Sequence, residues 1–580
     1  LSYRENSYLF SPDNLSNVQN LINPIAGLFP NFGRNALFDP NPYSAGFAEG
    51  IPTCESGLPI LDDREVTPDC ATMIAPDLKN QNEVTQTILE ANLVGDLTEM
   101  SAGPLQYALG LSYRENSYLF SPDNLSNVQN LINPIAGLFP NSVSGGEFDV
   151  SEVYGELLIP IVSNGPAGVE HFNVELGGRV SDWSMPQMPN LETYKALIDW
   201  AITPRYRIRG GFNRAFRAPN LGELFIGRTQ IFGGGGADFG DHCSQNLDTP
   251  SPYSATPGGG ASPEQIAQTL SICRALMGAS GATEYYEDPL DPIGEQPTGG
   301  GLGIPNSFGQ PNLREERADT WTMGVVMDFH DNFTMTVDWY EIEITDMIAL
   351  ESADSTYERC LSLEFNPTGN PNAPACNQIF RNPSTGGAAN IDRSFTNEGR
   401  ALMSGVDLQF NWSRPLGRGG FNLNTVANFN LDSITQDRPE LPEEDHAGFD
   451  SCSLQIQCQQ YDYRLFTTAS YFQGPWNISL RHQFWPELDN VSCRTAPTSD
   501  PCIYSSDPTY DLFALTGSYS FDRYTVRVGI ENLLDTEPPC IGQRPNNTPF
   551  PLDCTHSAGA SGAVYDPLGR RYFVSMTMDF

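Results

Sequence analysis

The side chains with the clearest chemistry in this chain are its twelve cysteines. They are Cys54, Cys70, Cys243, Cys273, Cys360, Cys376, Cys452, Cys458, Cys493, Cys502, Cys540 and Cys554. Taken in order they form six neighbouring couples, each in a stretch rich in Gly, Pro, Asp and Asn. An even count in such loop-like sequence favours disulfide bonds and an oxidising compartment. Metal binding is the alternative, but no couple has CxxC spacing and no histidine cluster accompanies them. We predict sequential disulfide pairing, although the sequence itself leaves the connectivity open.

Arginines recur at every second position of one segment, at Arg205, Arg207 and Arg209, and Arg217 continues the same phase. Alternate residues of a strand share one face, so a strand here would carry a basic strip. Such a strip could dock a carboxylate or an anionic ligand. It could equally be a solvated lining held by structural ion pairs.

Other chemistry is not indicated by the sequence. We find no catalytic triad, no paired-carboxylate site and no cluster of metal ligands. We therefore expect no catalytic residues, no metal site, no cofactor and no enzymatic activity.

Composition excludes several classes of protein. The 580 residues include 71 Asp and Glu against 31 Lys and Arg, a formal net charge of -40. Nucleic-acid binding needs a basic surface, so this class is disfavoured. No apolar run approaches the roughly 18 residues of a membrane-spanning helix. Aromatic residues make up 11% of the chain, which is too many for a disordered protein.

The elements that must position these side chains are strands. Apolar residues occupy alternate positions from Tyr524 to Ile530 and again from Tyr572 to Phe580, and about sixteen segments share this pattern. The connections between them alternate between short and long, the longest running from about 218 to 314, and all six cysteine couples fall in long connections. A soluble sandwich has no reason to sort its loops in this way. An outer-membrane β-barrel does, and closure also satisfies the backbone in lipid. We predict an all-β, antiparallel transmembrane barrel with short periplasmic turns and long extracellular loops.

The last predicted strand gives the orientation of the barrel. It follows a long loop, so Phe580 ends on the side of the short turns, which we place in the periplasm. The cysteines then lie outside the cell. A C-terminal Phe preceded by alternating apolar residues resembles the signal that the bacterial barrel-assembly machinery reads. The alternative is an ordinary edge strand that ends in Phe by chance.

Residues 1–31 recur without a single change at 111–141, and the flanking sequences then diverge at once. Structural repeats normally drift while they keep their period. Perfect identity with abrupt edges favours an artefact of sequence assembly or modelling, and a recent duplication is the alternative. We assign residues 32–580 to the C-terminal part of a β-barrel.

Several short motifs, in this order along the chain, resemble those of TonB-dependent outer-membrane receptors. They are Phe148-Asp149-Val150, Arg217-Ala218-Pro219-Asn220 with Glu223-Leu224-Phe225, Asn312-Leu313-Arg314-Glu315-Glu316, Val337-Asp338-Trp339-Tyr340, Asn397-Glu398-Gly399 and Ile530-Glu531-Asn532-Leu533. Each motif alone is weak, but their order and spread, from about residue 84 to 580, make the resemblance strong.

The resemblance implies a receptor in the bacterial outer membrane. It implies TonB-dependent uptake of a large, scarce nutrient such as a siderophore, haem, cobalamin or an oligosaccharide, through a barrel of 22 strands. The partners implied are outer-membrane lipid and lipopolysaccharide, the barrel-assembly machinery, an extracellular small-molecule or oligosaccharide ligand, and the TonB complex, which acts through a plug domain.

The sequence departs from this family pattern. We find neither a plug nor a TonB box, and about six strands fewer than the 22 of the family. The alternative function is therefore a passive, porin-like channel or a structural surface barrel. The identity of the ligand is not readable from the sequence.

Overall fold

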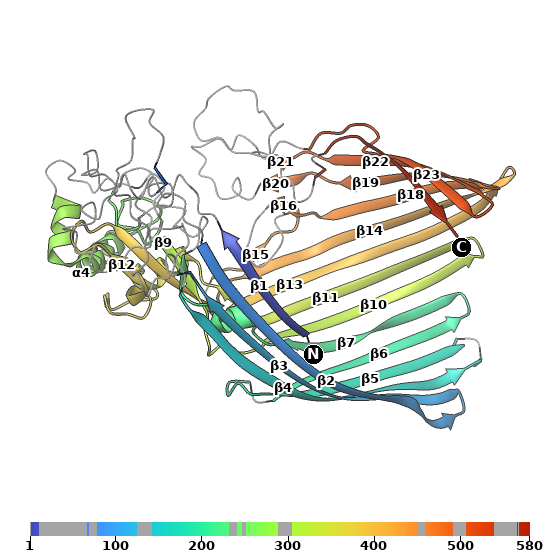
Figure 1. Ribbon diagram of the computed structural model, residues 1–580, viewed down its shortest axis with the longest axis horizontal. Helices are drawn as coiled ribbons and strands as arrows, with labels where there is room; N and C mark the ends of the chain where they lie inside the picture. Colours follow the sequence, from blue (N-terminus) through green and yellow to red (C-terminus); the bar gives the residue numbers. More distant parts are fainter. Residues whose placement is uncertain are drawn as a thin grey trace.

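The computed structural model describes residues 2–10, 67–68, 78–123, 142–230 apart from 167 and 189, 241–287 apart from 246 and 248–250, 304–490 apart from 440 and 451–458, 506–538, and 565–579 apart from 567. One sheet joins 20 of the described strands. Sixteen of them succeed one another as antiparallel neighbours. They are β1 (Ser2–Phe10), β2 (Leu78–Met100), β3 (Gly103–Ser121), β4 (Ser144–Ser163), β5 (His171–Trp183), β6 (Leu191–Thr203), β7 (Tyr206–Arg217), β10 (Glu316–His330), β11 (Phe333–Leu350), β13 (Ala388–Leu416), β14 (Gly419–Gln436), β18 (Tyr463–Gln473), β19 (Trp476–Trp485), β22 (Tyr510–Phe521), β23 (Tyr524–Glu531) and β24 (Arg571–Met578). Each predicted segment corresponds to one of these strands, and Figure 1 shows them as one curved sheet.

The connections are sorted by length, as predicted. Short turns join the strands at one end of the sheet, the turn end, and most of the long connections lie at the other, the loop end (Figure 1). Two-residue hairpins need backbone with positive φ, and Gly474 (φ 55°) and Asp522 (φ 50°) supply it in two of these turns. The C-terminus lies at the turn end, because the Asp579 N–H donates to the Arg523 carbonyl at 2.9 Å. Phe580 lies outside the described residues.

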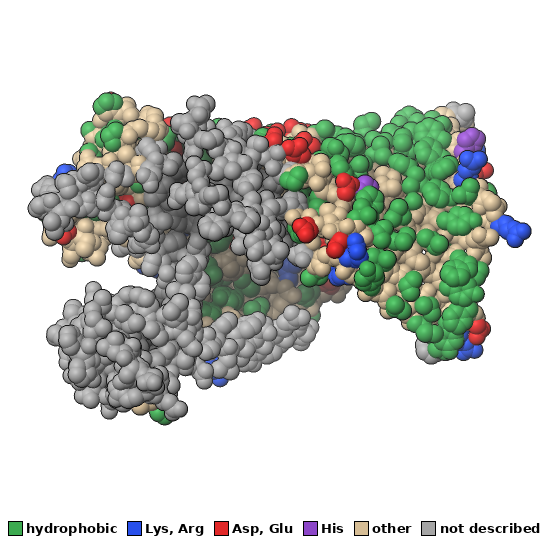
Figure 2. Space-filling model, turned by 90° about the horizontal axis from the view of Figure 1, so that it is seen from above, with side chains coloured by type: hydrophobic (Ala, Val, Ile, Leu, Met, Phe, Trp, Pro, Cys, Tyr) green, Lys and Arg blue, Asp and Glu red, His purple; other side chains and the backbone are tan. Residues whose placement is uncertain are grey.

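The two faces of the sheet differ in chemistry. Large apolar side chains are exposed on one face, among them Leu109, Val153, Leu176, Ile198, Met323, Leu480 and Val528. Figure 2 shows such side chains gathered over the strands toward the turn end. Charged and amide side chains dominate the other face. Phe148 on β4 and Ile348 on β11 belong to one buried cluster on that polar face, although four strands separate them. The polar face is therefore concave, and the apolar face is convex.

Aromatic rings border the convex apolar surface at both ends. Toward the loop end, Phe212 contacts Trp321, with ring centroids 4.6 Å apart. At the turn end, Phe329 contacts Tyr206, with centroids 6.4 Å apart. The eight residues from Trp321 to Phe329 span roughly 26 Å along β10, and strand tilt shortens this distance along the barrel axis. With a tilt of roughly 35–45° the axial distance is about 20 Å, somewhat less than the ~25 Å apolar band, bordered by aromatic belts, of outer-membrane barrels.

The repeated sequence appears twice beside the same strand. The second copy, which begins within β3 at Leu111, pairs with one edge of β2, and β1, from the first copy, pairs with the other. The registers differ: Ser2 lies opposite Gln86, whereas its equivalent Ser112 lies opposite Glu90. The two registers are offset by four residues. The origin of the repeat stays a prediction.

The long connections carry the remaining elements. The helices are α3 (Leu221–Phe225), α4 (Pro263–Glu287, interrupted at Gly278), α5 (Ala353–Leu361) and the 3₁₀ turn η4 (Cys376–Gln378). The short strands are β8 (Thr229–Gln230), β9 (Ile304–Phe308), β12 (Ile379–Arg381), β15 (Glu444–Asp445), β16 (Phe449–Asp450), β17 (Gln459–Gln460), β20 (Leu488–Asn490) and β21 (Ser506–Asp507). No helix in the described residues is long and apolar enough to cross a membrane.

Candidate functional site

A cavity of about 630 Å³ opens on the concave face, over β4 to β7, β10, β11 and β13. The polar side chains that line it are Asn173, Glu175, Asp199, Arg209, Thr322, Asp338, Tyr340 and Asp407. They come from six strands, because alternate residues of each strand point to this face. The cavity lies on the polar side of the sheet and gathers side chains from several strands, and we treat it as the candidate site.

Arg209 on β7 is one of the residues that line the cavity. Its guanidinium donates two hydrogen bonds to the Asp338 carboxylate on β11, at 2.9 and 2.7 Å. β10 lies between these strands, and its residue in the same row is Gly324. A Cβ at Gly324 would overlap Asp338 Oδ1, so glycine leaves the space through which the ion pair spans two strands.

The same arrangement recurs on the three neighbouring strands β4 to β6. Lys195 on β6 binds Glu175 on β5 at 2.6 Å and Glu156 on β4 at 3.1 Å. Gly177 lies in the row between Lys195 and Glu156, and a Cβ there would meet the Lys195 side chain at 2.8 Å. Glycine gaps thus let long polar side chains tie together strands that are not hydrogen-bonded neighbours.

The structure places Arg205 in the turn before β7 and the other three predicted arginines at different heights along β7, and each is ion-paired. Arg205 lies in the turn, 3.5 Å from Asp331, and Arg207 lies 3.4 Å from Asp199. Arg217 lies at the loop end, outside the cavity. Only Arg209 lines the cavity, where it is bound to Asp338. That any of these four arginines binds a ligand stays a proposal.

Carboxylates outnumber cations in the cavity. Glu175, Asp199, Asp338 and Asp407 line it, whereas Arg209 is the one basic residue among its described lining residues. Asp407 accepts a hydrogen bond from Asn428 Nδ2 at 2.8 Å, and no ion pair of Asp407 is present in the described part of the chain. Lys195 and Arg207, beside the cavity, pair with Glu175 and Asp199, so the surface has many hydrogen-bond acceptors and no excess of positive charge. It suits hydroxyl or amide groups better than anions.

At the loop end, Arg217 organises the motif that follows β7. Its guanidinium binds Glu316 on β10 at 2.6 and 2.8 Å and Glu223 of α3 at 2.9 and 3.1 Å. Glu223 also accepts from the Asn220 backbone N–H, and Asn220 Oδ1 accepts from the Glu223 N–H, which makes a capping box. The motif residues thus start α3 and hold it against the end of the sheet.

α3 packs onto the concave face near the loop end. Leu224 is buried in a cluster with Phe148, Met185, Met188, Leu313 and Ile348. Phe225 lies over Gly146 of β4, where a Cβ would meet its ring at 2.5 Å. The chain after β7 therefore crosses the hollow of the sheet from β7 toward β4, above the cavity.

Two of the long connections, after β7 and after β11, share a second hydrophobic core. Its members come from α4, α5, η4, β12 and the segment around 241–255. Two disulfides lie in it, Cys243–Cys273 and Cys360–Cys376, with no exposure of their cysteines. Both join the predicted sequential partners. The other eight cysteines lie outside the described residues, so their pairing stays a prediction. We call this unit the loop subdomain.

A fully buried ion pair joins the two halves of the loop subdomain. Arg381 donates from Nη1 and Nη2 to the two carboxylate oxygens of Asp241, both at 2.6 Å, and neither side chain is exposed. Tyr285 Oη donates to Asp241 Oδ2 at 2.7 Å. Burial opposes ionisation of Asp241, but the Arg381 charge and these hydrogen bonds outweigh it and hold the pKa of Asp241 below its ordinary value.

A second polar chain in the loop subdomain links Ser251, His242 and Asp354. His242 is fully buried, with Nδ1 3.0 Å from Ser251 Oγ and Nε2 3.0 Å from Asp354 Oδ1. The types match a hydrolytic triad, but His242 and Ser251 are both buried and face protein. The chain therefore connects the two loops. The sequence predicted neither this polar chain nor the Asp241–Arg381 pair. His242 and Asp354 lie 112 positions apart, Asp241 and Arg381 lie 140 apart, and no sequence pattern relates residues at such separations.

A family model described as TonB dependent receptor-like, beta-barrel, matches residues 31–533 of the chain. No curated protein matches it. Among solved structures, a variant of the ferric enterobactin receptor PfeA from Pseudomonas aeruginosa is 14% identical with a TM-score of 0.51, and the match covers 92% of this chain and 57% of that one.

The siderophore receptor PirA from Acinetobacter baumannii is 13% identical with a TM-score of 0.50, over 91% of this chain and 57% of that receptor. At sequence identities this low, the similarity shows a shared fold and nothing more. The chain spans a little over half the length of these structures.

Proposed function

Because this chain belongs to the TonB-dependent receptor family of outer-membrane β-barrels, we propose that its parent protein takes up a large, scarce nutrient across the outer membrane by TonB-dependent transport. This family is one of transporters and not of enzymes. The observation that carries the proposal is the family match over residues 31–533, on a sheet with the lipid-facing and polar faces of a barrel.

The cavity on the concave face supports the proposal that the lumen contacts a ligand or a plug. Its polar side chains are held by ion pairs across three strands, so they are preorganised and a passing group meets fixed acceptors. We propose Arg209, with Asp338 and Asp407, as the contact residues of the lumen. Arg205 and Arg207 are solvated lining in this proposal, and Arg217 positions the loop-end motif.

The charge of the cavity bears on the nutrient class. Three of the four lining carboxylates are ion-paired, and Asp407 has no ion pair in the described residues, so the cavity has no excess positive charge to attract a strongly anionic ligand. Of the four classes considered (siderophore, haem, cobalamin, oligosaccharide), a neutral, hydroxyl-rich oligosaccharide suits these acceptors best. A siderophore that meets cations elsewhere in the whole protein is the second candidate.

The partners follow from the same proposal. The TonB complex would act through a plug, the barrel-assembly machinery would insert the barrel, and lipopolysaccharide and other lipids would surround the convex face. The loop subdomain, at the extracellular end, would make the first contact with the ligand, and its disulfides would keep it folded outside the cell.

Uptake in cells tests the proposal. The complete gene is expressed in a receptor-deficient strain, and uptake of a labelled siderophore, haem, cobalamin and oligosaccharide is compared with TonB present and deleted. We expect accumulation of one class that is lost without TonB. Accumulation of small solutes that does not depend on TonB would instead identify the passive channel.

A further inference from the structure

The cavity on the concave face lies along a polar row that crosses the barrel wall. Strand register places Arg209, Gly324, Asp338, Asp407 and Asn428 side by side on β7, β10, β11, β13 and β14. Opposite residues of neighbouring strands lie about 5 Å apart, so a group bound at Asp407 is also close to Asp338. The cavity, at about 630 Å³, has the size of an ordinary ligand pocket.

Tyr340 on β11 places an aromatic ring beside this row, two residues nearer the loop end than Asp338. It lies opposite Gly405 of β13, where a Cβ would meet the Tyr340 hydroxyl at 2.5 Å and Cζ at 2.7 Å. The ring therefore extends along the wall across Gly405, and Asn428 Nδ2 donates to its hydroxyl at 3.3 Å. Because its tip is anchored on the wall, the ring lines the cavity as a fixed apolar surface.

The polar groups beside the ring include both acceptors and donors. Asp407 is exposed and accepts from Asn428, and it has no ion pair within the described residues. Arg209 uses two of its five N–H donors on Asp338. A hydroxyl group both donates and accepts, so it can bind a carboxylate and a guanidinium at once. A ligand carboxylate would instead be repelled by Asp407.

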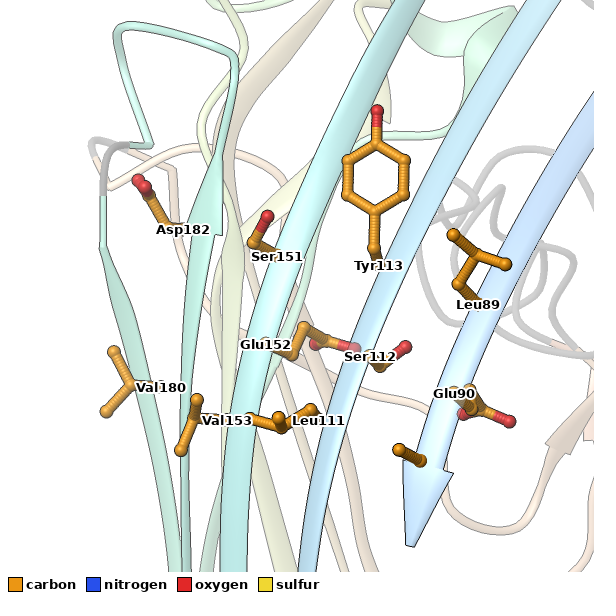
Figure 3. Close-up of a pocket in the computed structure, with 11 residues that line it drawn as sticks. Leu89, Glu90, Leu111, Ser112, Tyr113, Ser151, Glu152, Val153, Val180 and Asp182 are labelled. Carbon is orange, nitrogen blue, oxygen red and sulfur yellow. The ribbon is translucent and has the colours of Figure 1, made fainter.

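A hollow on the other face of the wall lacks this combination. It lies on the convex side of β2 to β5, where Leu111, Val153 and Val180 form an apolar row (Figure 3). Its described lining residues include no basic side chain, and these three apolar side chains are exposed on the lipid-facing surface. An aromatic ring, a free carboxylate and a guanidinium therefore meet in the lumen cavity, on the side of the wall that a water-soluble ligand reaches.

We propose that the cavity binds one pyranose ring of a neutral oligosaccharide, with sugar C–H groups against Tyr340 and hydroxyl groups on Asp407 and Arg209. A sugar ring has apolar C–H surfaces and a rim of hydroxyls, which match an aromatic ring beside hydrogen-bond donors and acceptors. The inference rests on the proposed uptake function for its class of ligand, and it adds the residues that recognise the sugar.

Calorimetry on the complete protein, purified in detergent, tests the site. The probes are the α-1,4-linked and β-1,4-linked glucose hexasaccharides and a hexasaccharide of galacturonic acid, which carries a carboxylate on each ring. We expect binding of a neutral hexasaccharide, and binding of the acidic one that is about fivefold weaker, as for one partly screened charge contact. Asp407→Asn removes the repelling charge and should bring the two affinities together.

Variants of the tyrosine separate recognition from folding. Tyr340→Ala removes the ring and should weaken binding about tenfold, whereas Tyr340→Phe keeps the ring and should bind within about twofold of the unaltered protein. Tyr154→Ala is the matched control and should bind normally, because Tyr154 also lies over a concave-face glycine, Gly110, but outside the cavity. Heat-dependent gel migration checks the fold of each variant.

Three results would overturn the sugar site: no binding of either neutral hexasaccharide, equal losses in Tyr340→Ala and Tyr154→Ala, or tighter binding of the acidic probe. The transport proposal fails separately. Sugar binding with the expected pattern of variants, but without TonB-dependent uptake in cells, would support the site and refute transport. TonB-dependent uptake of another nutrient without sugar binding would refute the site alone.

Discussion

Asp241 and Arg381 show at the scale of single residues how the loops are held. A buried carboxylate costs several kcal/mol of desolvation unless a cation and hydrogen bonds compensate it. Here the guanidinium covers both carboxylate oxygens, and Tyr285 adds a third donor. The two partners come from different loops, so their pairing fixes one loop against the other.

Removal of the arginine should loosen the loop subdomain. Arg381→Met leaves the Asp241 charge buried without its cation, and we expect the local free energy of unfolding to fall by about 3–5 kcal/mol. Hydrogen exchange of the α4 amides measures this change. The double variant Asp241→Leu with Arg381→Met removes both charges and should regain most of the stability. Equal protection of α4 in the single variant and the unaltered protein would contradict the assignment.

The Asp241–Arg381 pair also makes the stability of the loop subdomain depend on pH, and the direction of this dependence follows from the pKa of Asp241. The pKa of Asp241 is lower in the folded state than the ordinary carboxyl value of about 3.9. Its stabilisation is therefore complete above pH ~4 and is lost as the pH falls through the folded-state pKa. We expect α4 protection to hold from pH 7 to about pH 4 and to decline below it. Asp241→Asn should remove this decline.

Strands of the barrel are tied together at the scale of elements by polar side chains that reach across a glycine. Arg209 reaches Asp338 over Gly324, and Lys195 reaches Glu156 over Gly177. Such ties add cross-strand links beyond the backbone hydrogen bonds of adjacent strands. They also hold the polar groups of the lumen in one geometry.

A methyl group at one of these glycines should break its tie. Gly324→Ala places Cβ against the Asp338 carboxylate, and overpacking of this kind costs roughly 1–3 kcal/mol. Gly517→Ala on β22 is the matched control, because its Cβ would meet Val528 at an ordinary 3.9 Å. The temperature at which the folded, faster-migrating gel form disappears measures both. We expect a lower temperature for Gly324→Ala alone.

At the junction of β7 and α3, the position of the helix depends on the shape of the Arg217 side chain as well as on its charge. Lysine keeps the charge but lacks the planar fork that binds Glu223 and Glu316 together. Arg217→Lys should raise the rate of proteolysis within 218–315 about tenfold, which corresponds to roughly 1.4 kcal/mol. Arg205→Lys, whose contact to Asp331 is 3.5 Å and exposed, should leave this rate unchanged. If the two variants are cleaved alike, the fork has no special role.

β1 raises a question that peptide mapping answers. The first copy of the repeat joins Asn31 to Phe32, whereas the second joins Asn141 to Ser142. We propose that residues 1–31 are an artefact of the sequence. A digest of the natural protein should then contain the Asn141–Ser142 junction alone. Detection of the Asn31–Phe32 junction would make the duplication real.

The whole molecule consists of a barrel wall and a loop subdomain that are stabilised by different means. Strand pairing and lipid contact hold the wall, whereas a small core and two disulfides hold the subdomain. The disulfides close segments of 30 and 16 residues, and each is worth roughly 3–4 kcal/mol in the chain-entropy model.

Reduction should therefore separate the two parts. With a thiol reductant under mildly loosening conditions, we expect protease to cut the loop subdomain while the heat-dependent gel shift of the barrel wall persists. Because the four cysteines are buried, reduction should follow subdomain opening. Loss of the gel shift together with the loops would show instead that the wall depends on the disulfides.

The sequence by itself determined the strands, the sorting of their connections and the alternation that gives the sheet an apolar face, because the period of two and the contrast between short and long loops are local properties of the chain. It also determined which cysteines are neighbours, and both described disulfides join such neighbours. The basic strip shows where this reasoning ends. Alternation placed Arg209 on the polar face, but its charge is cancelled by Asp338, two strands and 129 residues away. Only the tertiary structure decided the balance of charge in the cavity and the Asp241–Arg381 pair. Each depends on contacts between segments that are distant in sequence.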